Sequence, residues 1–263
     1  MKKNLTLSFA LFLCASGTML AQQPAKPESS KFPQPEMMKP GMTEIWEPEV
    51  KIIQPGATNS EAPSDAIILF NGGDISKEWT DRKGGPSKWL VQDGALVSVR
   101  GAGMIYSIRK FGNLQLHIEW KTPSEVIGES QGRGNSGVFL QELYEVQVLD
   151  SYNNRTYRNG QAASVYKQYA PLVNACKGPG EWQTYDIIFT APTFNSDTTR
   201  YYTPPRVTVI HNGVLVQNNV SLRGPTEYIG VPEYFIKVHG PGSLVLQDHG
   251  NPVAYRNIWV REL

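Results

Sequence analysis

Short apolar runs that alternate with polar residues fill the chain from Asp65 onward. Because a strand places successive side chains on opposite faces, this period of two predicts half-buried β-strands. The runs are rich in Val, Ile, Tyr and Trp, and no segment keeps a helical period for three turns. Strands are expected at residues 66–70, 89–92, 95–99, 104–107, 114–121, 137–141, 144–149, 164–166, 182–190, 206–211, 214–220, 244–248 and 258–262.

Turn residues separate these runs. Asp93-Gly94 and Asn212-Gly213 each stand between two apolar runs, which is the strongest short-range signal for a β-hairpin. Many short strands in one segment predict a single all-β domain over residues 65–263, folded as a two-sheet jelly-roll (concanavalin A-like) β-sandwich. A domain of this length can bury enough surface to fold without disulfides.

The N-terminal residues have the pattern of an export signal. Lys2 and Lys3 precede an apolar run over residues 5–15, which is too short to span a bilayer, and cleavage after Ala21 fits. Residues 22–42 are rich in proline and predict a flexible leader. Residues 43–64 contain Ile45 and Trp46, which are too apolar to leave in water. We expect this segment to be an arm packed on the domain, and the alternative is a disordered linker.

Net charge, hydropathy and cysteine content limit the range of functions to be expected. Removing residues 1–21 takes two lysines and leaves a net charge of −1 (23 minus 24), so nucleic acid is not an expected partner. No later segment is apolar for about 18 residues, so no membrane span is expected. Cys176 would be the one cysteine left, and it is interpreted as a small buried hydrophobe. The exported protein would act in the periplasm or outside the cell, and its oligomeric state is not indicated.

Polar side chains of the kind that do chemistry alternate along residues 144–149. Glu145 and Gln147 share one face of this strand and lie about 6.6 Å apart, close enough to touch one sugar ring. The strand 114–121 carries His117 and Glu119 on its polar face, which is either a solvated face or the floor of a sugar groove.

Further candidates lie near the C-terminus and among the tyrosines. Gln247 and His249 are two residues apart and lie on the same face of one expected strand, and Arg256 follows after a turn. A histidine beside a solvated glutamine can serve as acid or base near neutral pH, and the alternative is a turn histidine whose ring caps a backbone carbonyl. Tyr166 belongs to a tyrosine cluster that could stack on sugar faces, and Lys167 could be a cation at the rim of the groove.

A conventional two-acid mechanism lacks its second acid on this strand. A retaining glycosidase needs two carboxyl groups about 5–5.5 Å apart, whereas Glu145 is followed two residues later by the amide of Gln147. Glu119 or Asp150 would have to supply the partner. The four histidines do not have the spacing of zinc ligands, and a calcium or other divalent cation held by oxygen ligands stays open.

A series of motifs gives the chain a family likeness. They are Leu69-Phe70-Asn71-Gly72, Asp93-Gly94, Asn135-Ser136-Gly137, Tyr144–Ser151 (YEVQVLDS), Gly180-Glu181-Trp182, His211-Asn212-Gly213-Val214, Leu246–Gly250 (LQDHG) and Arg256-Asn257-Ile258. In this order they resemble the 3-keto-disaccharide hydrolase domain family, which was long described as a domain of unknown function and is frequent in exported Bacteroidetes proteins. The resemblance covers about residues 43–263. One departure is Ala163-Ser164-Val165-Tyr166, where many members have Gly-Ala-Ile-Tyr.

The resemblance implies a laminarinase- and lectin-like jelly roll that acts on glycosides whose C3 hydroxyl has been oxidised to a ketone. The ketone acidifies the C2 proton, so one base, one group that stabilises the enolate and one acid suffice for elimination and hydration. Glu145 or His249 would be the base, and Glu119 or His249 the acid. Arg256, Lys167 or a bound cation would stabilise the enolate, and the remaining substrate contacts would come from Gln147, Asn135, Gln247, His117 and Tyr166. The alternatives are a conventional glycoside hydrolase and a non-catalytic carbohydrate-binding module.

Overall fold

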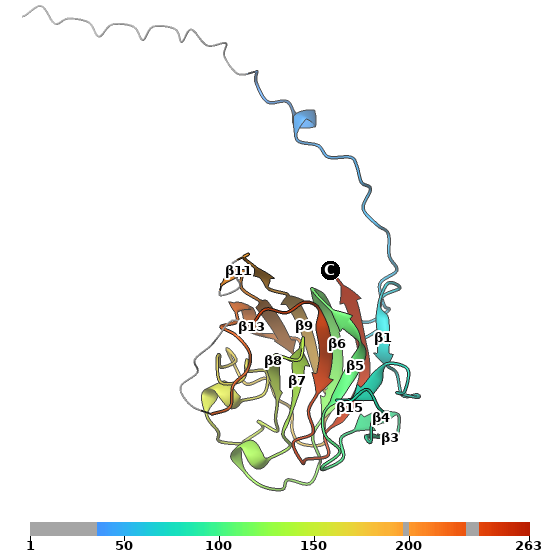
Figure 1. Ribbon diagram of the computed structural model, residues 1–263, viewed down its shortest axis with the longest axis vertical. Helices are drawn as coiled ribbons and strands as arrows, with labels where there is room; N and C mark the ends of the chain where they lie inside the picture. Colours follow the sequence, from blue (N-terminus) through green and yellow to red (C-terminus); the bar gives the residue numbers. More distant parts are fainter. Residues whose placement is uncertain (1–35, 197–199, 230–236) are drawn as a thin grey trace, which may run out of the picture. The chain divides into compact units, whose positions relative to one another are not determined.

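The computed structural model describes residues 36–196, 200–229 and 237–263 (Figure 1). The expected signal peptide and most of the leader lie outside the described residues. The chain divides into two units, Met1–Lys51 and Ile52–Leu263. In the first unit, Pro40–Met42 form a short 3-10 helix (η1), and Ile45, Trp46 and Val50 are exposed.

The second unit is built from two antiparallel sheets. The larger sheet has the strand order β13-β12-β9-β6-β15-β4-β3, and β1 also pairs with β15. Its strands are β1 (Ile67–Phe70), β3 (Leu90–Gln92), β4 (Ala95–Val97), β6 (Leu114–Lys121), β9 (Gln183–Thr190), β12 (Arg206–His211), β13 (Val214–Ser221) and β15 (Ala254–Glu262).

The smaller sheet has five strands in the order β2-β5-β14-β7-β8. Its strands are β2 (Trp79–Asp81), β5 (Ile105–Phe111), β7 (Ser136–Leu140), β8 (Tyr144–Val148) and β14 (Gly242–Leu246). A separate pair is formed by β10 (Thr193–Phe194) and β11 (Tyr201–Thr203), and the loops contain the 3-10 turns η2 (Ser130–Gly132) and η3 (Arg158–Gly160). The predicted all-β sandwich is confirmed. Among the described residues, no helix is long and apolar enough to cross a membrane.

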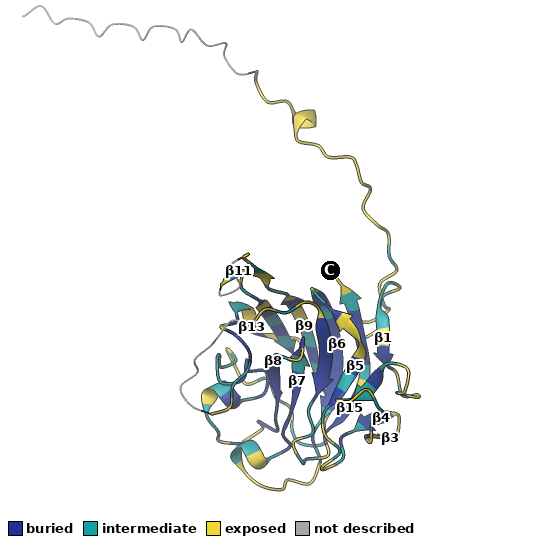
Figure 2. Cartoon of the chain, in the orientation of Figure 1, coloured by how far each residue is buried: buried dark blue, intermediate teal, exposed yellow. Residues whose placement is uncertain are grey.

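Strand alternation places the core between the two sheets (Figure 2). On β6, Leu116 and Trp120 point into the core, and on β8, Val146 and Val148 do the same. Side chains also link the sheets directly, since the Tyr185 hydroxyl on β9 donates a hydrogen bond to the main-chain oxygen of Gln147 on β8 (2.7 Å). The polar residues between these core positions therefore face outward, as the period of two predicts.

The two predicted hairpins are both present. Asp93-Gly94 joins β3 to β4 with φ angles of 51° and 72°, and Asn212-Gly213 joins β12 to β13 with φ angles of 51° and 80°. Positive φ at both central positions is the requirement of the type I′ turn, whose twist matches that of the flanking strands.

Three strands were not expected, and one expected strand is absent. The unexpected strands are β2, β10 and β11, and each has three residues or fewer, which is too short for an alternation of apolar and polar residues to be recognised. Residues 164–166 do not form a strand, because Val165 makes only isolated bridges to Val146 and Tyr169. This segment instead belongs to a loop that lies along the edge of β8.

Residues 54–64 of the predicted arm lie in the second unit and are hydrogen-bonded within it. The main-chain oxygen of Ser60 accepts hydrogen bonds from the Trp259 indole (3.1 Å) and from the Asn257 amide (2.8 Å), both on β15. The main-chain oxygen of Gln54 accepts a bond from the amide of Ser64. The packing of residues 43–51 stays a prediction.

Candidate active site

A cavity of about 260 Å³ lies on the outer face of the five-stranded sheet. Strand alternation brings Glu145 and Gln147 of β8 to this face, and Phe139 of β7 is the register partner of Glu145. The lining residues are Asn135, Phe139, Glu145, Gln147, Tyr166, Thr226, Tyr228, Gln247 and His249. Six of the predicted site residues therefore come together, although they are spread from residue 135 to residue 249 of the sequence.

A loop covers the edge of β8 and buries the floor of the cavity. The amide of Tyr166 donates to the main-chain oxygen of Glu145 (3.1 Å), and the amide of Gln147 donates to that of Ser164 (3.0 Å). The side chain of Tyr166 then lines the cavity. As a result, Glu145 is only 4% exposed and Gln147 only 1% exposed.

Glu145 is a deeply buried carboxyl group. Among the described residues, its carboxyl group forms no ion pair, and burial in these surroundings raises its pKa to about 8. A carboxylate that is buried without an oppositely charged partner loses the hydration that stabilises its charge, so its neutral form is favoured. Such a group releases and takes up protons near neutral pH, which is the property of a general acid or base.

Gly137 provides the space for this carboxyl group. It lies on β7 opposite Gln147, and a Cβ atom at Gly137 would overlap the Oε1 atom of Glu145. The φ angle of Gly137 is not in the positive region, so the requirement for glycine here is steric rather than conformational.

The amide of Gln147 is held in one orientation by its neighbours. The Gln131 side-chain nitrogen donates to the main-chain oxygen of Gly160 (2.9 Å), and the Asn135 nitrogen donates to that of Gln131 (2.6 Å). The side-chain oxygens of Gln131 and Asn135 are therefore acceptors, and Gln147 Nε2 donates to Asn135 (3.0 Å). This orientation leaves Gln147 Oε1 as a buried acceptor without a donor in the described structure.

Gln247 carries a second acceptor of this kind. Its Oε1 atom is also buried and has no hydrogen-bond donor in the described part of the chain. Buried acceptors are normally satisfied by protein or water, so two of them lining one cavity favour a ligand with hydroxyl donors. His249, which is exposed, adds an imidazole at the mouth of the cavity.

Lys167 lies beside the cavity among aromatic rings. Its Nζ atom is 4.4 Å from the centre of the Tyr157 ring, 5.8 Å from that of Tyr166 and 5.7 Å from that of Tyr228. Two of these rings line the cavity, and the Tyr157 and Tyr166 hydroxyls are hydrogen-bonded at 2.6 Å. Lys167 is therefore close to two lining rings, and its role as a cation at the rim stays a prediction.

Three predicted site residues lie on the other sheet. Glu119 and His117 are on β6 and Arg256 is on β15, both strands of the eight-stranded sheet. The chain crosses between sheets from β6 to β7 and again from β14 to β15. Glu119, His117 and Arg256 therefore do not share the cavity with Glu145, and the expectation that one concave face gathers them all is wrong for these three.

These three residues form a charged network of their own. Arg256 donates to Glu119 (2.6 Å), and the His117 ring bonds Asp186 (2.7 Å) and lies 3.8 Å from Glu119. His117, and then Asn257 and Arg256, lower the pKa of Glu119 to about 2 against the effect of burial. Burial lowers the pKa of His117, but Asp186 and Glu119 outweigh it and raise that pKa to about 9. These charges are therefore paired with one another on the larger sheet.

Comparisons with known proteins place this chain in a family. The family model for the 3-keto-alpha-glucoside-1,2-lyase-like domain matches residues 65–261. The chain belongs to this family. The resemblance noted from the sequence motifs is thereby confirmed.

Individual relatives agree with the family match. A 3-keto-disaccharide hydrolase of Bacteroides thetaiotaomicron is 27% identical over 220 residues, covering 68% of this chain and 71% of that protein. A solved structure from Parabacteroides distasonis, described as a candidate glycosyl hydrolase, is 51% identical, with a TM-score of 0.80 and coverage of 86% of this chain and 97% of that chain. A second structure from the same organism shares the fold at 23% identity, with a TM-score of 0.55 and coverage of 81% and 100%.

Three lining residues were not predicted from the sequence: Phe139, Thr226 and Tyr228. Phe139 lies in an expected strand, and its parity could have placed it beside Glu145. Thr226 and Tyr228 come from an irregular loop whose sequence carries no period. Thr226 also positions the strand, because its hydroxyl accepts a hydrogen bond from the amide of Glu145 (2.9 Å).

The described residues contain no group of side chains that could bind the divalent cation left open by the sequence. Over residues 36–196, 200–229 and 237–263, no group of three or more His, Cys, Asp or Glu side chains is arranged so that it could hold a metal ion. Cys176 is partly buried against the core, and burial raises the pKa of its thiol to about 11, which fits its interpretation as a packing residue.

Proposed function

We propose that this protein is an exported hydrolase that cleaves 3-keto-glycosides, with Glu145 as the base. Family membership supports a carbohydrate hydrolase, and one observation carries the finer assignment. Glu145 is the only carboxyl group among the described residues that line the cavity, and its pKa is raised to about 8. Direct glycosidic hydrolysis needs two carboxyl groups, whereas elimination from a 3-keto-glycoside needs a single base.

The chemistry balances with one base and water. Glu145 takes the proton from C2, and the electron pair moves into the enolate of the C3 ketone. The enolate collapses, the bond from C1 to the glycosidic oxygen breaks, and that oxygen leaves with a proton from a general acid. Water then adds to C1 of the enone and a proton returns to C2, so the net reaction is hydrolysis.

Other residues of the cavity have roles that follow from their chemistry. His249 is at the cavity mouth, where an imidazole can give a proton to the leaving oxygen. The unpartnered oxygens of Gln147 and Gln247 accept hydrogen bonds from sugar hydroxyls. Lys167 contributes positive charge near the rings of Tyr166 and Tyr228, which favours the enolate.

The substrate test compares a glucoside with its 3-keto form. We expect the protein to release the aglycone from a nitrophenyl 3-keto-glucoside and to leave the unoxidised glucoside intact, because only the ketone acidifies the C2 proton. Absorbance of the released nitrophenol measures both rates. Equal cleavage of the two compounds would instead identify a conventional glycoside hydrolase, and binding without cleavage of either would identify a carbohydrate-binding module.

The Gly137→Ala substitution tests the position of the base. The new Cβ atom would push the Glu145 carboxyl group away from its place, and a misplacement of about 1 Å can reduce catalysis about 10²-fold. The loss should appear in kcat on the 3-keto-glucoside. Gly112→Ala is the matched control, since nothing lies within 4 Å of a Cβ atom there. Unchanged kcat in Gly137→Ala, with the fold intact, would contradict this role for the carboxyl group.

A further inference from the structure

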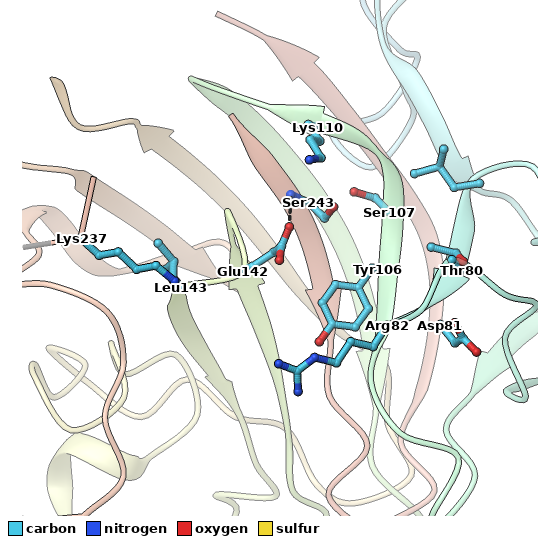
Figure 3. Close-up of a pocket in the computed structure, with 12 residues that line it drawn as sticks. Thr80, Asp81, Arg82, Tyr106, Ser107, Lys110, Glu142, Leu143, Lys237 and Ser243 are labelled. Atoms are coloured by element: carbon cyan, nitrogen blue, oxygen red, sulfur yellow. Dashed lines mark hydrogen bonds between the residues drawn. The ribbon is translucent and has the colours of Figure 1, made fainter. Parts of the chain in front are cut away.

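A second and larger cavity, of about 700 Å³, also lies on the five-stranded sheet. Strands β2 and β5 and the turn between β7 and β8 supply most of its walls, and Figure 3 shows the ring of Tyr106 at its centre with Arg82 beside it and Glu142 nearby. None of the residues discussed as catalytic lines this cavity.

The lining is rich in cations that form no ion pair within the described part of the chain. Arg82, Lys110 and Lys237 line the cavity, and none of them forms an ion pair with a described residue. The two carboxylates of the lining are both engaged by main-chain amides. Asp81 accepts from the amides of Lys83 and Gly85 (both 2.8 Å), and Glu142 accepts from that of Ser243 (3.3 Å). Three cations against two carboxylates give the lining a net charge of +1, which favours an anionic ligand.

Tyr106 gives the cavity an aromatic floor next to a charge. Its side chain is half-buried, and burial raises the pKa of its hydroxyl while the charge of Arg82 acts in the opposite direction. An aromatic ring beside a guanidinium suits a sugar that carries a negative group, because the ring stacks on the sugar face and the guanidinium binds the anion.

The cavity shares a face with Glu145. The strand register forms one row across the sheet, made of Thr80, Tyr106, Val245, Phe139 and Glu145. Register partners in an antiparallel sheet point to the same side. Tyr106 and Glu145 are three strands apart, or about 15 Å at the usual strand spacing. One extended saccharide can therefore reach both.

We infer that this cavity binds an anionic sugar unit, a uronate or a sulfate ester, on the leaving-group side of the substrate. The inference rests on the proposed function in that it assigns a second subsite to the same substrate. Arg82, Lys110 and Lys237 bind the anion, and Tyr106 stacks on the sugar ring. Charge-assisted hydrogen bonds are the stronger class, so the anion should tighten binding about tenfold or more.

The test measures the affinity of unoxidised disaccharides by calorimetry. The probes are cellobiose, 4-O-β-glucosyl-glucuronate and cellobiose sulfated on its reducing unit. We expect one or both anions to bind at least about tenfold more tightly than cellobiose, and the preference to shrink between about 0.02 M and about 0.5 M salt. The carboxylate and sulfate probes together identify which anion the cavity takes.

Two charge-matched triple variants decide whether this cavity is responsible. The preference should disappear, with cellobiose binding unchanged, in the variant Arg82→Gln, Lys110→Gln, Lys237→Gln. It should persist in a control that removes three exposed cations lining neither cavity, Lys83→Gln, Lys88→Gln, Arg155→Gln. Equal affinity for neutral and anionic probes, or a preference retained by the first variant, would overturn the inference. Because no probe carries a ketone, this result is independent of whether 3-keto-glycosides are cleaved.

Discussion

Glu145→Gln is expected to reduce turnover of a 3-keto-glucoside by about 10²–10⁴-fold, the usual contribution of a general base. Glutamine has nearly the same shape, so it can occupy the space over Gly137, but it cannot accept the C2 proton. Steady-state release of nitrophenol from the 3-keto-glucoside gives kcat and KM. We expect the loss mainly in kcat, because the unpartnered acceptors that bind the sugar stay in place.

The pH dependence distinguishes a base from an acid at this position. A base works in its ionised form, so kcat/KM of the wild-type protein should rise with pH and level off above about 8, where Glu145 becomes ionised. An acid would give the reverse profile. Glu129→Gln, at an exposed loop position, is the control and should behave as wild type. A Glu145→Gln protein with wild-type kcat would move the base to another residue, with His249 the next candidate.

Strand parity was the most informative feature of the sequence for the site. It separated Glu145 and Gln147 from the core residues Val146 and Val148, and the structure has the same division. Parity works because the side-chain period of a strand is fixed by its backbone, whatever the rest of the fold does. The type I′ hairpins were predictable for a similar local reason, since Asn-Gly and Asp-Gly tolerate positive φ angles.

The alternation of side chains along a strand does not predict which sheet that strand joins. His117 and Glu119 alternate on β6 as clearly as Glu145 and Gln147 do on β8, yet the two pairs face opposite sides of the sandwich. Sheet membership depends on long-range pairing, and nothing local in residues 122–135 or 247–253 marks these segments as the connections between sheets. Glu119, His117 and Arg256 were misplaced for this reason.

The raised pKa of Glu145 was equally invisible in the sequence. It arises because the loop containing Tyr166 pairs with the edge of β8 and removes water from the carboxyl group. Without that loop the same strand would present Glu145 to solvent, where a carboxyl group titrates near its ordinary value. The chemistry of this site therefore depends on a long-range contact between a strand and an irregular segment.

The burial of Glu145 should also lower the free energy of unfolding by an amount that depends on pH. Below about pH 4.5 the carboxyl group is protonated in both the folded and the unfolded protein, and there is no penalty. As the pH rises toward 8, the unfolded protein loses this proton while the folded protein keeps it, so stability falls. Above about pH 8 both are ionised and the penalty is complete, on the order of 3–5 kcal/mol at about 1.4 kcal/mol for each unit of pKa.

Glu145→Gln removes this titration and should therefore stabilise the protein at alkaline pH. Relative to wild type, we expect its Tm to be roughly 10 °C higher at about pH 9, and the difference to shrink toward zero at about pH 4. Thermal unfolding at a series of pH values, followed by circular dichroism, measures the trend. Glu262→Gln, at an exposed position at the end of β15, is the matched control and should show no such trend. A Tm difference that is flat with pH would mean that Glu145 titrates as an exposed carboxyl group, and the proposed base would lose its physical basis. The stabilised variant would also be the inactive one, which is the expected sign of a group whose burial serves catalysis at the expense of folding.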